Sequence, residues 1–191
     1  MKPSDENKAI AKEILRVFGG RPSVAKYWDD QHVSHIDILS TINQPFEGVS
    51  SYSTIGLSDY SIGYTGEEKP LRVEVIGAHA TENNDFPNIL ATCAFNVMNS
   101  KQAISPGEVF QDIVALYYRD SEMQHILFTD PFLWKNLKSI ELPEKTVAWL
   151  LAVPISNNEY LYSLDKGIDA LEDLFEQEDI DIFDIERKSV V

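Results

Sequence analysis

Residues 32–59, "HVSHIDILSTINQPFEGVSSYSTIGLSD", decide the fold class. Apolar and polar residues alternate on both sides of the segment "NQPFEG", whose proline and glycine favour a turn. Successive side chains of a β-strand point to opposite faces, so the alternation predicts two strands, over residues 33–42 and 51–59. Strands joined by so short a connection pair antiparallel, because a parallel pair needs a long crossover.

The same pattern extends along the chain. Further strands are predicted over residues 24–28, 71–80, 109–118, 125–130 and 146–155, and helices over 5–18, 84–99 and 158–176. A doubly wound parallel sheet would need a helix after nearly every strand, and those helices are missing. We therefore predict an α+β fold, with a mixed, largely antiparallel β-sheet and about three main helices, in a single domain over residues 1–191.

The last predicted helix has apolar residues at intervals of three or four, which predicts one buried face. These residues are Leu161, Leu164, Ile168, Leu171, Leu174 and Phe175. An acidic C-terminal segment, residues 177–191, follows the helix, and within it "DIDIFDI" alternates acids with isoleucine or phenylalanine. This segment is either a strand with one apolar face or an amphipathic segment that packs on a partner.

Composition limits the class of protein. The chain has 191 residues, of which 43% are apolar and 25% charged, as in soluble globular proteins. Its N-terminus has no apolar core of a secretory signal, and it has no run of 18 apolar residues that could span a membrane. Cys93 is the only cysteine and cannot form an internal disulfide. These features lead us to expect a cytoplasmic protein that does not contact a membrane.

The formal net charge is −15, which repels nucleic-acid phosphates, so direct nucleic-acid binding is not expected. Residues 165–191 contain ten acids and three bases, so nearly half of the excess lies at the C-terminus. Six acids there are candidate contacts for a basic partner: Asp173, Glu176, Glu178, Asp179, Asp181 and Asp184. The alternative is that these acids only keep the end of the helix solvated.

Candidate chemistry is limited to one strand. His35 and Asp37 share a face of the strand over residues 33–42, and a metal would need a third ligand, such as Glu74 or His79 on another strand. Alternatively, His35 and Asp37 hydrogen-bond to each other or to backbone. "GLSDY" lacks the final glycine of a nucleophile elbow. No other catalytic or cofactor motif is present, so no catalytic residue, metal or cofactor is assigned.

Cysteine and tryptophan side chains are expected in the core. Cys93 falls on the apolar stripe of the helix over residues 84–99. Trp28, Trp134 and Trp149 lie in or beside apolar strands.

Several of these segments, taken in order, resemble the suppressor-of-fused-like family. They are "HIDILS", "STIGLSD", "LRVEVIG", "PGEVF" and "WLLAVPISNNEYLYSLDKGIDALEDLFE", and the similarity runs from about residue 25 to 177. Among bacterial members, the chain is most similar to the YqcF-type antitoxins. These are immunity proteins paired with toxins that carry an LXG export domain and a toxic C-terminal domain, often a nuclease.

The resemblance implies a protein that binds and neutralises a cognate toxin, without enzymatic activity. The toxin it implies is of the LXG type, with a nuclease as its C-terminal domain. Animal members have a second domain for which this chain has no room, so their peptide-binding role is not carried over. Two alternatives remain open: a metal-binding or hydrolytic enzyme that uses His35 and Asp37, and a cytoplasmic adaptor that binds an unrelated protein. The residues do not indicate an oligomeric state.

Overall fold

The computed structural model describes residues 3–64, 69–81 and 85–191. These residues form four α-helices, two short 3-10 helices and eight strands. Their order is α1 (Asp5–Phe18), β1 (Pro22–Trp28), β2 (His35–Ile42), β3 (Val49–Ile55), η1 (Leu57–Asp59), β4 (Leu71–Ala80), α2 (Phe86–Ser100), β5 (Val109–Phe110), η2 (Val114–Leu116), β6 (Met123–Thr129), β7 (Ile140–Glu141), β8 (Thr146–Ser156), α3 (Asn157–Lys166) and α4 (Ile168–Gln177).

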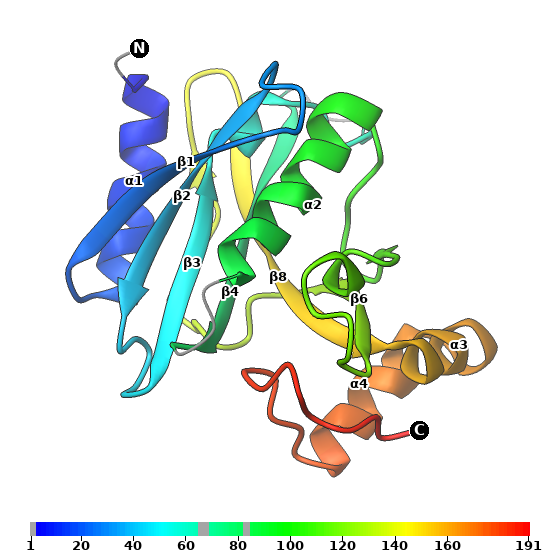
Figure 1. Cartoon of the computed structure of the whole chain (residues 1–191). Helices are drawn as coiled ribbons and strands as arrows, with labels where there is room; N and C mark the ends of the chain where they lie inside the picture. The colour runs from blue at the N-terminus through cyan, green and yellow to red at the C-terminus, as the bar shows by residue number, and fades with distance from the viewer. Residues whose placement is uncertain (1–2, 65–68, 82–84) are drawn as a thin grey trace.

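All eight strands belong to one sheet. Seven of them have the order β1-β2-β3-β4-β8-β6-β5, and β7 pairs with the beginning of β8 (Figure 1). Every pair is antiparallel except β4–β8, which is parallel. The predicted α+β class with a mixed, largely antiparallel sheet is therefore confirmed.

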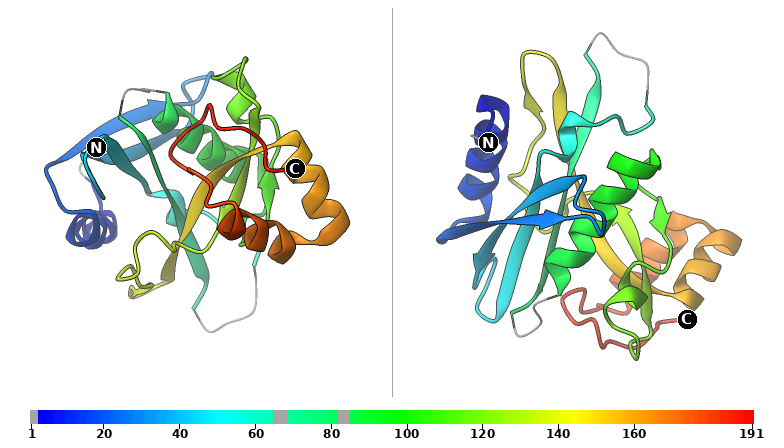
Figure 2. Two further views of the ribbon diagram at one scale, coloured as in Figure 1. Left: turned by 90° about the horizontal axis from the view of Figure 1, so that it is seen from below. Right: turned by 45° about the horizontal axis from the view of Figure 1, so that its top comes forward.

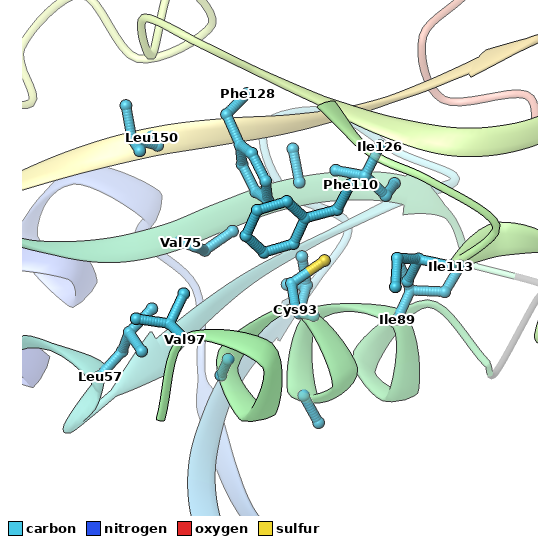
Figure 3. Close-up of a cluster of buried hydrophobic side chains, with 14 of the residues drawn as sticks. Leu57, Val75, Ile89, Cys93, Val97, Phe110, Ile113, Ile126, Phe128 and Leu150 are labelled. Atoms are coloured by element: carbon cyan, nitrogen blue, oxygen red, sulfur yellow. The ribbon is translucent and has the colours of Figure 1, made fainter. Parts of the chain in front are cut away.

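The sheet is covered on both faces. α2 packs on one face, where Cys93 is buried against Phe110 and Phe128, as expected (Figure 3). Burial raises the pKa of the Cys93 thiol. α1 and α4 pack on the opposite face, with Ile14 of α1 and Leu171 of α4 fully buried (Figure 2). The core is thus two apolar layers on either side of one sheet.

Two predicted strands are shorter than expected. β3 ends at Ile55 because Gly56 has a left-handed backbone (φ 106°) and starts the 3-10 helix η1. The strand predicted over 109–118 is only the two residues of β5, because Asp112 also has a positive φ, of 60°. The Asp112 amide donates to His125 Nδ1 at 2.9 Å, a side-chain bond in place of a ladder bond.

The predicted helices also differ in their bounds. The helix expected over 84–99 corresponds to α2, although Asn84 lies outside the described residues. The helix expected over 158–176 is broken at Gly167 (φ 94°) into α3 and α4, which explains the fourth helix. Because α4 takes a new direction, Leu171 is buried, whereas Leu161 and Leu164 of α3 are 52% and 66% exposed, contrary to the prediction.

Residues 178–191, here called the C-terminal strap, continue the chain after α4. The strap does not fully match either predicted alternative. It forms successive turns and contains no strand. Ile182 and Phe183 pack on the α4 face, whereas Ile185 is buried in the α2 layer, so the strap passes around one end of the sheet. The Ala80 amide donates to the Phe183 carbonyl, and the Ser121 hydroxyl donates to the Ile185 carbonyl.

A buried ion pair fixes the far end of the strap. The Arg187 guanidinium forms two hydrogen bonds with the Glu159 carboxylate of α3, at 2.6 and 2.9 Å, and both side chains are buried. Arg187 also donates to the Pro154 carbonyl, and Glu159 accepts from the Val190 amide. The strap is therefore held by charge-assisted bonds as well as by apolar contacts.

No helix in the described part of the chain combines the length and the apolar character that crossing a bilayer requires.

Candidate functional site

His35 and Asp37 lie on β2, next to the edge strand β1. Asp37 forms an ion pair with Lys26 of β1 at 2.8 Å, and the His35 ring packs on Trp28, with centroids 4.8 Å apart. Trp28 is 47% exposed, so the prediction that it belongs to the core is wrong, whereas Trp134 and Trp149 are buried as expected. His35 and Asp37 thus have partners of their own and do not bond to each other.

Glu74 and His79, the candidate third ligands, lie elsewhere, on β4. The buried Glu74 carboxylate accepts hydrogen bonds from the Thr54 hydroxyl at 2.6 Å and from the amides of residues 56–58 at 2.9–3.1 Å. Burial raises the pKa of Glu74, and these donors oppose the rise. Glu74 therefore caps the start of η1 and has no free position for a ligand.

His79 is also buried and distant from β2, because β3 lies between the two strands. Its Nδ1 lies 3.1 Å from the Ala80 carbonyl, and its ring stacks on Phe86. Burial lowers its pKa. Within residues 3–64, 69–81 and 85–191, no three histidine, cysteine, aspartate or glutamate side chains converge to hold a metal. The structure does not assemble the metal or acid–base site considered from the sequence.

The six candidate acids near the C-terminus are all exposed. Glu176 and Asp179 line a groove, described below, but the other four do not. Asp181 and Asp184 lie in turns of the C-terminal strap, where they accept hydrogen bonds from the Phe183 and Glu186 amides. Asp173 lies on α4 beside the groove, and Glu178 is the first residue of the strap. The structure thus brings together only part of the predicted set.

This groove is here called the acidic groove. One side is formed by α4 and the start of the strap, and the other by the loops that flank β5 and β6. Its volume is about 870 Å³. Its apolar lining includes Phe132, Ile168 and Phe175. Six carboxylates line it: Glu108, Asp130, Asp169, Glu172, Glu176 and Asp179. No lysine, arginine or histidine is found among the described residues that line it.

Glu172 of α4 has a raised pKa. Partial burial raises its pKa, and the negative charges of Asp169, Asp130, Asp173 and Glu176 raise it further. The described residues that line the groove therefore give it a negative potential. A site of this kind can accept a cationic side chain together with apolar groups.

The sequence analysis did not identify four of the six groove acids as candidates. Asp169, Glu172 and Glu176 follow one another at intervals of three and four, so a helical projection of residues 168–177 could have shown them on one face. Glu108 and Asp130 come from segments that the fold brings to α4, and no local sequence pattern indicates that placement.

Comparisons with known proteins place the chain in a family. The family model for the suppressor of fused protein matches residues 32–188. The chain is 47% identical to the protein named Immunity protein YqcF of Bacillus subtilis (strain 168) over 192 residues, which covers 100% of both chains.

Solved structures have the same fold. The crystal structure of a suppressor of fused homologue from Neisseria gonorrhoeae FA 1090 superposes with a TM-score of 0.75 at 18% identity, covering 98% of this chain and 97% of that one. Drosophila Suppressor of Fused gives a TM-score of 0.67 at 15% identity, covering 96% of this chain and 50% of that one. The chain therefore belongs to the suppressor of fused family.

Proposed function

We propose that this chain is an immunity protein, which binds a cognate toxin inside the producing cell and neutralises it without catalysing a reaction. The support is the identity of 47% over the whole length with a protein named as an immunity protein. We further propose that the toxin is of the LXG type and that the neutralised part is a nuclease domain. This finer statement rests on the resemblance to the YqcF-type antitoxins and on charge.

The acidic groove is the observation that carries the proposed binding mode. A nuclease domain binds a polyanion and is therefore usually basic. Six carboxylates around an apolar lining, in a chain of net charge −15, attract such a surface and accelerate its encounter. Phe132, which is 53% exposed at the groove, is positioned to contribute apolar contact area once the partner has docked.

Co-expression with the toxin tests the function. The neighbouring genes are searched for a protein with an LXG export domain, and its C-terminal domain is expressed in a sensitive host with and without this chain, with survival scored. Rescue by this chain, and no rescue by an immunity protein of a different toxin, is the expected result. Death in both cases, with the chain folded and soluble, contradicts the proposed function.

A binding experiment tests the groove. A triple variant, Asp130→Asn, Glu172→Gln and Glu176→Gln, removes three groove charges. The control, Asp30→Asn, Glu47→Gln and Glu144→Gln, removes three exposed charges outside the groove. The groove variant should associate with the toxin domain several-fold more slowly at low salt, and the control variant should differ little from the wild type. Equal loss in both variants would show that only net charge matters.

A further inference from the structure

Strand β1 is an edge strand, and none of the strands formed by residues 3–64, 69–81 and 85–191 pairs with its outer side. It is the first strand in the order of the sheet and pairs only with β2. Six of its seven residues are exposed, including Val24 at 57% and Trp28 at 47%. Figure 1 shows β1 at the margin of the sheet, away from α4 and the strap. A row of free backbone donors and acceptors beside exposed apolar side chains is a surface suited to pairing with another strand.

We infer that β1 pairs antiparallel with β1 of a second copy of this chain, so that two sheets join into one across a two-fold axis at Ala25. Two-fold symmetry requires one residue to face its own counterpart. Ala25 is the middle residue of Pro22–Trp28, so this register pairs all seven residues of both strands. A register centred on any other residue leaves the ends of the strands unpaired.

In this register, the side chains of β1 in one copy complement those of β1 in the other copy. This register places Arg21 of one copy opposite Asp29 of the other at both ends of the strand pair, where the Asp29 carboxylate is held by the Val33 and Ser34 amides of its own chain. Pro22, which has no amide hydrogen to donate, faces Trp28, whose indole packs on His35 of its own chain and is 47% exposed.

Neither neighbouring register on the same strand has this complementarity. Centring the pair on Val24 sets Arg21 opposite Tyr27 instead of Asp29. Centring the pair on Lys26 sets two lysines against each other and leaves Arg21 beyond the end of the partner strand. In the register centred on Ala25, Lys26 lies opposite Val24 and keeps its ion pair with Asp37 at 2.8 Å, while its methylene stem covers the valine. Charge therefore favours the register that also gives the greatest overlap.

The position of β1 limits repulsion between two chains of charge −15. Nearly half of the excess lies in residues 165–191, at the opposite end of the sheet from β1. Pairing at β1 keeps these acidic regions apart and leaves both acidic grooves open. The inferred dimer therefore does not depend on the proposed function, and the proposed function does not depend on the dimer.

A cysteine cross-link tests the register directly. In Ala25→Cys, the two new cysteines face each other, and the Cα separation of directly opposed antiparallel residues, about 4.5–5.5 Å, suits a disulfide. The native Cys93 is fully buried and does not compete. Ala103→Cys, on an exposed loop, is the matched control. Under mild oxidation, Ala25→Cys should form a disulfide-linked dimer much faster than Ala103→Cys.

Sedimentation velocity of the untagged chain over a range of concentrations tests the dimer itself. The wild type should shift towards a dimer mass as its concentration rises. Ala25→Glu sets two acids against each other and should remain monomeric at concentrations where wild type and Ala103→Glu are dimeric. Circular dichroism checks that each variant is folded. A wild type that stays monomeric throughout, or cross-linking no faster in Ala25→Cys than in Ala103→Cys, overturns the inference.

Discussion

Arg187 of the C-terminal strap and Glu159 of α3 form a buried ion pair, with Nη1 and Oε1 2.6 Å apart. Removal of Arg187 leaves a buried carboxylate without its counter-charge. We expect Arg187→Ala to lower the free energy of unfolding by about 3–5 kcal/mol, measured by urea denaturation. The adjacent Lys188–Glu122 pair is exposed to solvent, which screens it, so Lys188→Ala should lower the free energy of unfolding far less than Arg187→Ala. Equal effects of the two substitutions would show that the strap is not anchored by the buried pair.

Leu171 anchors α4 to the sheet. It is fully buried, so Leu171→Asp places an unpaired charge in the core and should lower the free energy of unfolding by about 3 kcal/mol or more. Leu164→Asp is the control, because Leu164 on α3 is 66% exposed. It should change the free energy of unfolding by about 0.5 kcal/mol or less. Thermal melts of both variants check the difference. A Leu171→Asp protein that melts with the wild type would mean that α4 is not docked.

The raised pKa of Glu172 predicts a pH dependence of stability. Its pKa in the folded protein lies above the ordinary value of 4.5, so folding favours the protonated form. The stabilising contribution of that proton is complete below the ordinary pKa and is lost as the pH rises through the folded pKa. Glu172→Gln keeps the hydrogen-bonding shape but does not ionise.

We therefore expect Glu172→Gln to melt at a higher temperature than the wild type at neutral pH. The two curves should converge when the pH falls below the ordinary glutamate range. Glu178→Gln, on the strap outside the groove, is the control for loss of one negative charge. A constant difference at all pH values would indicate that the effect does not come from ionisation of Glu172.

The six acids selected from the sequence should not be equivalent in binding. Glu176 and Asp179 line the acidic groove, whereas Asp181 and Asp184 do not. If the groove receives the toxin, Glu176→Gln with Asp179→Asn should slow association at low salt. The effect should shrink above about 0.5 M salt, where the Debye length is only a few Å. Asp181→Asn with Asp184→Asn removes the same charge outside the groove. Stopped-flow measurements on both double variants check whether the position of the acids or only the net charge determines the association rate.

The fold class could be predicted because it depends on local patterns. Alternation of polar and apolar residues marks β2 and β3, and spacings of three and four mark α1 and α2. The break at Gly167 could not be predicted, because glycine is tolerated within helices and only its backbone angle shows the change of direction. The exposure of Trp28 could not be predicted either, since it depends on the position of β1 at the edge of the sheet.

The residues of the acidic groove could likewise be predicted only in part from the sequence. The charge excess of residues 165–191 is visible in the sequence, and it led to Glu176 and Asp179. Glu108 and Asp130 join them only because β5 and β6 lie beside α4 in the folded chain. His35 and Asp37 gave a misleading signal, since each has another partner: Asp37 forms an ion pair with Lys26, and His35 packs on Trp28.

The parallel pairing of β4 with β8 sets the order in which the chain can fold during synthesis. β1 to β4 form a meander of local contacts, and hairpins of this kind close within about 1–10 μs. The free edge of β4, however, has to wait for β8, which emerges only after α2 and β6. Until then, the nascent chain has an incomplete sheet with an apolar, unpaired edge, which can associate with other chains. Slower growth at low temperature, or an excess of chaperone, should therefore increase the yield of folded protein without any change in its stability.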